Sequence, residues 1–229
     1  MLTRLRRLLS PLSAHGEGAR GLQTLASLDA YAQWAASYPP NAHNVLMEAE
    51  QAAMTSLFPP MTGKIVLDLA CGTGRYGLLA QESGAKTVLG LDNSPAMLLA
   101  SPLSSRALAT TEAVPLSANS VDVILCGLAL GHLPRLAPSI GEIARVLKPG
   151  GCALVSDFHP FIYLNGARRT FTAPNGKTYA VEHYAHLYSD YHRAAAEVGL
   201  RIDAVLEPRR DATPIVIVYK FVKIPPTSA

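Results

Sequence analysis

A glycine-rich segment with a carboxylate close by is the best candidate for chemistry in this chain of 229 residues. Residues 66–77 read VLDLACGTGRYG, so Gly72, Gly74 and Gly77 follow the pattern G-x-G-x-x-G. In α/β proteins this pattern joins a strand to a helix and lets a nucleotide-bearing ligand approach the backbone closely. Dinucleotide-dependent enzymes share the pattern, so the glycines alone do not select the ligand.

Two aspartates beside the glycines favour a cationic ligand. Asp68 lies four residues before Gly72, at the end of an expected strand, and Asp92 ends the next expected strand. A carboxylate next to a pyrophosphate would be unfavourable by on the order of 1–4 kcal/mol, whereas it attracts a sulfonium or an ammonium group. Asp92 has the position of a carboxylate that accepts hydrogen bonds from ribose hydroxyls. Its alternative role is to cap, together with Ser94, the helix that follows.

The elements that must position these residues alternate along the chain. Apolar runs of strand length lie at 64–69, 87–91, 121–126 and 153–157, and helical segments lie at 74–83, after 94 and at 138–147. This order predicts an α/β fold with a doubly wound, mostly parallel sheet. Two further strand-like runs, 201–206 and 215–222, close the chain and predict an antiparallel edge strand.

The segments outside this alternation define the expected domain organisation. Residues 1–24 form a basic leader, flexible or weakly helical, with a targeting leader as the alternative. Residues 25–60 form an N-terminal helical lid, and residues 61–229 form the main domain. Within that domain, turn signals mark residues 158–185 as an insert on the substrate side, where 169–172 and 178–182 can pair as a hairpin.

Four sequence blocks together resemble the class I, Rossmann-like S-adenosylmethionine-dependent methyltransferases. They are VLDLACGTGRYG, LGLDNSPAML, TEAVPLSANSVDVILCGLALGHL and ARVLKPGGCALVSDF, in that order. They are most similar to the small-molecule branch of the family, which includes enzymes of the ubiquinone and biotin pathways. The resemblance covers about residues 64–157 and implies a seven-stranded sheet and S-adenosyl-L-methionine as the cofactor.

The resemblance also implies roles for particular cofactor-binding residues. Asp68, Ala70, Gly72 and Gly74 would line the methionine end. Asp92 would hold the ribose with Asn93 beside it, Glu112 and Ala113 would lie near the adenine edge, and Cys126 would lie by the transferring methyl group. The family often has an acidic residue near position 110, where this chain has two threonines, so adenine recognition can instead depend on backbone groups or on a threonine hydroxyl.

The catalytic candidates are two histidines that follow strands. His132 and His159 would lie at the ligand-bearing edge of the sheet, where an imidazole can act as a general base. Asp157 would share a face with His159 and could orient it. For both histidines the alternative is a structural role in anchoring a loop.

The substrate candidates come from the lid and the insert. Tyr38 and His43 belong to the lid, Arg168 and Arg169 could clamp an acidic acceptor, and Tyr184 lies in a run rich in polar aromatic residues. Ordinary packing or solvated surface positions are the alternatives for these five residues. No metal site is expected, because His183, His186 and His159 lack a further set of ligands.

Composition excludes several classes of function. Of 20 basic and 17 acidic residues, four arginines and one glutamate lie in residues 1–20, so the remainder carries 16 of each and is neutral. A neutral body argues against nucleic acid as a partner, and no apolar run is long enough for a membrane span. The three cysteines fall in or beside buried strands and fit no zinc pattern, as expected of reduced thiols in a cytoplasmic protein.

The sequence therefore predicts transfer of a methyl group from S-adenosylmethionine to a small or carrier-bound metabolite, with oxygen as the favoured acceptor atom. Carboxyl methylation of a malonyl- or acyl-carrier thioester is a special case. A non-catalytic S-adenosylmethionine-binding regulatory module is the alternative from another class.

Overall fold

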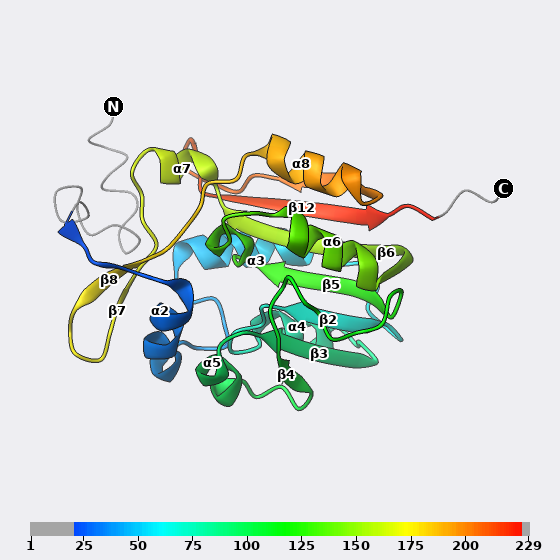
Figure 1. Ribbon diagram of the computed structural model, residues 1–229, viewed down its shortest axis with the longest axis horizontal. Coiled ribbons are helices and arrows are strands. Elements are labelled where there is room, and N and C mark those ends of the chain that lie inside the picture. The colour runs from blue at the N-terminus through cyan, green and yellow to red at the C-terminus, as the bar shows by residue number, and fades with distance from the viewer. Residues whose placement is uncertain (1–20, 226–229) are drawn as a thin grey trace.

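A seven-stranded sheet forms the centre of the protein (Figure 1), described by a computed structural model over residues 21–225. The strand order is β4-β3-β2-β5-β6-β12-β9. The strands are β2 (Ile65–Leu69), β3 (Thr87–Asp92), β4 (Arg106–Leu108), β5 (Val121–Gly127), β6 (Leu147–Phe158), β9 (Leu200–Leu206) and β12 (Val216–Lys223). The prediction of a doubly wound, mostly parallel seven-stranded sheet is confirmed.

Helices cover both faces of the sheet because neighbouring residues of each strand point to opposite sides. In β5, Val123 and Leu125 join one hydrophobic cluster, whereas Ile124 and Cys126 join the other. The first cluster includes residues of α3 (Val45–Ser56), α4 (Arg75–Glu82) and α5 (Pro95–Ala100). The second includes residues of α6 (Ala137–Val146) and α8 (Tyr188–Glu197).

The antiparallel strand lies one position in from the edge of the sheet. β12 runs antiparallel to both β6 and β9, so β9 occupies the edge and has the same direction as the parallel strands. The expected antiparallel pairing is present, but the strand that reverses is shielded on both sides. A hairpin-like pair, β10 (Arg209–Arg210) and β11 (Thr213–Pro214), lies between β9 and β12 in the chain.

A smaller three-stranded sheet packs with the N-terminal segment at one end of the molecule (Figure 1). Its strands are β1 (Thr24–Leu25), β7 (Thr170–Thr172) and β8 (Thr178–Val181), with β7 and β8 forming the predicted hairpin. β1 pairs in parallel with β8, so Thr24, expected within the leader, is part of a sheet. Residues 1–20 of the predicted leader lie outside the described residues.

The N-terminal helical segment is not one continuous helix. It consists of α2 (Ser27–Trp34), the 3-10 turn η2 (Ala35–Ser37) and α3. A further turn, η3 (Leu130–His132), follows β5, and a short helix, α7 (Pro160–Leu164), follows β6. No helix within residues 21–225 is long and apolar enough to cross a bilayer.

Candidate functional site

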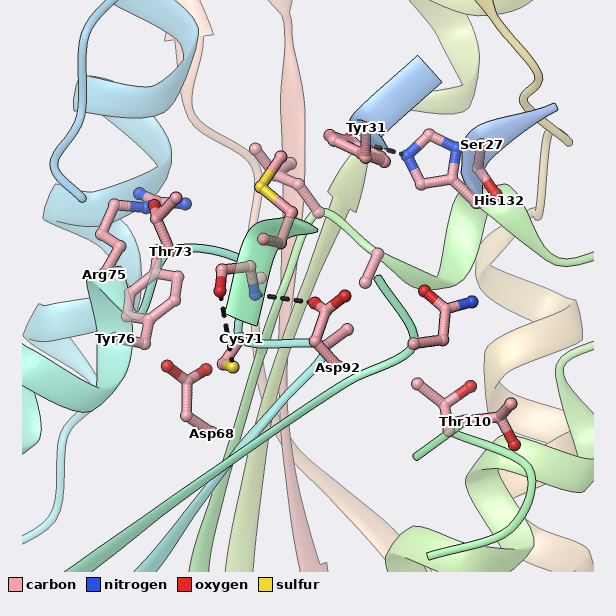
Figure 2. Close-up of a pocket in the computed structure, with 18 of the residues that line it drawn as sticks. Ser27, Tyr31, Asp68, Cys71, Thr73, Arg75, Tyr76, Asp92, Thr110 and His132 are labelled. Atoms are coloured by element: carbon pink, nitrogen blue, oxygen red, sulfur yellow. Dashed lines mark hydrogen bonds between the residues drawn. The ribbon is translucent and has the colours of Figure 1, made fainter. Parts of the chain in front are cut away.

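A cavity opens at the carboxyl ends of β2, β3 and β5 (Figure 2), where the strand order reverses between β2 and β5. Ligands of open α/β sheets bind at such a reversal, because the loops leaving neighbouring strands diverge there. The lining residues come from these loops, from the segment after β4, from the N-terminal segment, from α4 and α5, and from the insert. They are Ser27, Tyr31, Tyr38, Asp68, Ala70, Cys71, Gly72, Thr73, Arg75, Tyr76, Asp92, Asn93, Met97, Ala109, Thr110, Thr111, Glu112, Gly127, Leu128, Ala129, His132, Leu133 and Arg169.

The glycine-rich loop forms one wall of the cavity. Gly72 has a φ of +54°, and a side chain built on it would meet nothing within 4 Å, so its backbone faces open space. Gly74 has a φ of +90°, and a β-carbon there would lie 2.8 Å from Ser101 Oγ and 2.9 Å from Leu103 Cγ. Glycine at 74 is therefore required both by the left-handed backbone and by the packing behind the loop.

Asp92 connects the end of β3 to this loop. One carboxylate oxygen accepts a 2.7 Å hydrogen bond from the backbone N–H of Gly72, and the other accepts a 2.8 Å bond from that of Ser94. Burial of the side chain raises its pKa, although these backbone donors act in the opposite direction. Each oxygen keeps a second lone pair, so the carboxylate can accept further bonds from a ligand in the cavity.

Asp68 is a buried carboxylate at the end of β2. Its Oδ2 accepts a 2.7 Å hydrogen bond from the backbone N–H of Gly77, at the start of α4. Burial raises the pKa of Asp68 to about 7 against the lowering effects of the Gly77 bond and of the Arg75 charge. No cationic side chain among residues 21–225 lies within 4.0 Å of it. The Asp68 carboxylate therefore favours a cationic ligand, whose charge would stabilise its ionised form.

A buried ion pair adjoins the part of the cavity wall next to Asp68. Arg75 Nη1 lies 2.7 Å from Glu50 Oε2, and the Arg75 guanidinium stacks over the Tyr76 ring at 4.4 Å. Glu50 comes from α3 and also accepts a 2.5 Å hydrogen bond from Ser156 at the end of β6. Helix α3 is thereby attached to the start of α4 and to the end of β6.

His132 and Arg169 meet on the opposite side of the cavity. Arg169 Nη1 lies 2.6 Å from His132 Nε2. The Tyr31 hydroxyl lies 3.1 Å from the same nitrogen (Figure 2). His132 Nδ1 lies 2.6 Å from the carbonyl oxygen of Glu182. Because a guanidinium can only donate, Nε2 accepts and Nδ1 carries the proton, which fixes one neutral tautomer. Burial, together with the Arg169 charge, lowers the pKa of His132 to about 3.

The structure brings many of the predicted residues to this cavity. Asp68, Ala70, Gly72, Asp92, Asn93 and Glu112 line it, as do His132, Tyr38 and Arg169. Gly74, Ala113 and Cys126 do not line it. Gly74 packs behind the loop, Ala113 is exposed, and Cys126 is fully buried in the second hydrophobic cluster, so the adjacent Gly127 faces the cavity in its place.

His159 lies away from the cavity, and Asp157 does not orient it. β6 ends at Phe158, and His159 caps α7 by accepting a 3.2 Å bond from the backbone N–H of Phe161. Its other ring nitrogen lies 3.3 Å from Glu207 Oε1. Asp157 accepts a 2.7 Å bond from the Tyr191 hydroxyl instead. The predicted Asp157–His159 pairing is therefore wrong, because the chain turns into a helix immediately after the strand.

The remaining substrate candidates separate into different environments. Arg168 donates to the carbonyl oxygens of Tyr163 and Ala167 and stacks on the Tyr163 ring, so it does not form a clamp with Arg169. Tyr184 donates a 2.7 Å bond to Glu182 and does not line the cavity. His43 lines a second cavity beside the first.

Several lining residues carried no recognisable signal in the sequence. Thr73, Arg75 and Tyr76 line the cavity and occupy positions that the pattern G-x-G-x-x-G leaves unspecified. Leu128 lines the cavity with a φ of +56°, a conformation that leucine rarely adopts. Thr110 and Thr111 line the cavity next to Glu112, although the Thr111 hydroxyl also bonds to Ser139 at 2.7 Å.

Comparison with known proteins places this site in a methyltransferase domain. The family model described as "Methyltransferase domain" matches residues 67–155. An uncharacterised methyltransferase of Mycobacterium tuberculosis is 36% identical over 130 residues, which are 55% of this chain and 48% of that protein. A malonyl-[acyl-carrier protein] O-methyltransferase of Methylococcus capsulatus is 30% identical over 173 residues, 72% of this chain and 59% of that protein. The chain thus spans about half the length of the first of these relatives.

Solved structures show the same fold. A crystal structure of an S-adenosylmethionine-dependent methyltransferase from Mesorhizobium loti matches with a TM-score of 0.63 and 24% identity, covering 76% of this chain and 97% of that one. One from Methanosarcina mazei matches with a TM-score of 0.57 and 19% identity, covering 75% and 97%.

Proposed function

Because the chain belongs, through its methyltransferase domain, to the class I S-adenosylmethionine-dependent methyltransferases, we propose that it transfers a methyl group from this cofactor to a small or carrier-bound metabolite. The observation that carries the proposal is the pair of buried carboxylates, Asp68 and Asp92, on either side of an open glycine loop. This arrangement offers negative charge to the cationic end of the cofactor and hydrogen-bond acceptors to its ribose.

The residues of the cavity fit the cofactor chemically. Asp68, a carboxylate with no cationic side chain within 4.0 Å in the described structure, suits the ammonium or sulfonium group. Asp92 retains lone pairs for the two ribose hydroxyls, and Gly72 leaves the backbone accessible to the ligand. When bound, the cofactor supplies a methyl group on a positively charged sulfur, which is already activated for displacement.

The chain's own contribution is then chiefly to align the acceptor with the methyl group and to exclude water. We favour an oxygen acceptor that is already ionised, because His132, the only histidine among residues 21–225 that lines the cavity, is unsuited to act as a base. The Nε2 atom of His132 already accepts from Arg169, and a protonated ring would face the Arg169 charge.

Isothermal titration calorimetry with S-adenosylhomocysteine tests the cofactor assignment, and transfer of a labelled methyl group to fractionated metabolites tests the reaction. We expect binding in the micromolar range and label in an organic product. No binding of either S-adenosylmethionine or S-adenosylhomocysteine by folded protein would contradict the proposal. Binding without transfer to any fraction would instead favour a regulatory module.

Carboxyl methylation of a malonyl-carrier thioester is the second candidate. It is supported by the similarity to the Methylococcus enzyme and by the guanidinium of Arg169 in the cavity, to which an acid can bind. The test is methyl transfer to purified malonyl-carrier protein, read as a mass increase of one methyl group on the malonyl moiety. An unmodified carrier after prolonged incubation would exclude this acceptor.

A further inference from the structure

A second cavity adjoins the first and has a different character. It has a volume of about 360 Å³ and shares Tyr38, Leu128 and Arg169 with the cofactor cavity. Its walls come from the N-terminal helices, the end of β6 and the β7–β8 hairpin. The other lining residues are Trp34, His43, Asn44, Leu46, Met47, Phe158, Thr170, Phe171, Thr172 and Thr178. The cavity is thus mostly apolar and aromatic, with threonines near the hairpin.

Arg169 is the only charged side chain that lines this cavity within the described structure. It is 9% exposed, yet no carboxylate among residues 21–225 lies within 4.0 Å of it. Its Nη1 donates to the Leu128 carbonyl oxygen at 2.7 Å and to His132 at 2.6 Å, and both of these acceptors are neutral. A buried charge without a counter-ion is unfavourable, so an anion bound beside Arg169 would stabilise the guanidinium.

The guanidinium is also held in a fixed position. Leu128 and His132 restrain Nη1, and the group lies over the Tyr31 ring at 5.9 Å. Its Nη2 and Nε atoms have no hydrogen-bond partner in the described protein, which leaves donors for a planar anion. Arg168 does not take this place, because it lines neither cavity: its Nη1 donates to the carbonyl oxygens of Tyr163 and Ala167, and its guanidinium stacks on the Tyr163 ring.

We propose, on the basis of the proposed methyltransferase function, that the second cavity is the acceptor site and binds an organic carboxylate. The carboxylate pairs with Arg169 at the junction of the two cavities, and the apolar or aromatic body of the acceptor lies against Trp34 and Phe171. A carboxylate matches one guanidinium in charge and in bidentate geometry, whereas a phosphate monoester brings up to two charges and one more acceptor oxygen.

Trp34 provides a direct probe, because it is the only tryptophan in the chain and it lines this cavity. The protein is saturated with S-adenosylhomocysteine, and Trp34 emission is followed during titration with phenylacetate or octanoate. The neutral isosteres phenylacetamide and octanamide serve as matched ligands, and phenyl phosphate serves as the alternative anion. We expect at least one of the two acids to bind at least tenfold more tightly than its amide and than phenyl phosphate.

Three variants test whether the preference depends on one guanidinium. Arg169→Gln should remove the preference for the acid over the amide, whereas Arg168→Gln should keep it within threefold of the wild type. Arg169→Lys keeps the positive charge and serves as the test if Arg169→Gln folds poorly. It should bind the acid with an affinity between those of the wild type and the glutamine variant.

The outcomes separate this proposal from the cofactor assignment. If the wild type binds S-adenosylhomocysteine but shows no preference for either acid, or prefers phenyl phosphate, the acceptor proposal is wrong and the cofactor assignment stands. An unchanged preference in Arg169→Gln would also overturn it. Failure to bind S-adenosylhomocysteine would contradict the proposed function itself.

Discussion

Replacing Asp92 by asparagine should remove cofactor binding while leaving a folded protein. Each hydrogen bond from a ribose hydroxyl to a carboxylate contributes about 1.5–3 kcal/mol. Loss of two such bonds corresponds to a dissociation constant higher by roughly two to four orders of magnitude. Calorimetry with S-adenosylhomocysteine measures this change directly, because the ligand retains the ribose but lacks the sulfonium charge.

The same substitution disturbs the protein itself, which requires a control. Asp92 accepts from the backbone N–H groups of Gly72 and Ser94, and an asparagine can satisfy only one of them. The unsatisfied buried donor should lower the free energy of unfolding by about 1–3 kcal/mol.

Asp122→Asn is the matched control. Asp122 accepts a 2.8 Å bond from the backbone N–H of Ile65 and pairs with Lys148 at 3.0 Å, but it does not line the cofactor cavity. It should lose stability while the dissociation constant of the cofactor stays within threefold of the wild type. If Asp92→Asn, shown by circular dichroism to be folded, also binds within threefold of the wild type, the ribose assignment is refuted.

Three further predictions concern the same cavity. The affinity for S-adenosylmethionine should fall by up to tenfold per pH unit below about pH 7, because protonation removes the Asp68 charge. Calorimetry measures this fall in the wild type, and the Asp68→Asn variant should not show it. Gly74→Ala should lower the melting temperature more than Gly84→Ala does, because both have a positive φ but only Gly74 is crowded by its neighbours. In NMR titrations the His132 ring should stay neutral from pH 8 down to about pH 4, and a protonation near pH 6.5 would contradict its pairing with Arg169.

The raised pKa of Asp68 has an opposite consequence for stability. Its folded-state pKa of about 7 exceeds the usual value of 3.8, so the folded protein binds the proton more tightly than the unfolded chain does. The contribution of Asp68 to the free energy of unfolding is therefore fully present below about pH 3.8. This contribution is lost as the pH rises from there through about 7. The ionised Asp68 that favours the cofactor thus opposes folding of the ligand-free protein.

The strand ends were predictable from the sequence because the geometry of a parallel sheet is strict. Asp68 and Asp92 end neighbouring strands, which pair as β2 and β3, so their carboxylates had to meet at one edge. Cys126 shows the limit of this reasoning, since alternation along β5 directs it into the core and leaves Gly127 at the cavity. A shift of one residue is enough to exchange the two faces of a strand.

Residues in loops were less predictable because their direction depends on local turns. His159 follows a strand as His132 follows another, yet the helix α7 begins at Pro160 and turns His159 towards Glu207. Arg168 and Arg169 are adjacent and identical in type, but only the second enters the cavity. The pairing of Glu50 with Arg75 joins two helices and has no signature in either segment.

The opposite charges at the two ends of the joined cavities determine which ligand binds at which end. Asp68 and Asp92 make the cofactor end negative, whereas Arg169 makes the junction with the second cavity positive. A cationic cofactor and an anionic acceptor each bind at one end, and exchanging them would place like charges together at a cost that burial increases. His132 contributes by remaining neutral, because a protonated imidazole 2.6 Å from Arg169 Nη1 would repel it and disturb the position of the guanidinium. On this reasoning His132 is a positioning residue, so His132→Gln should weaken carboxylate binding while leaving the affinity for S-adenosylhomocysteine intact.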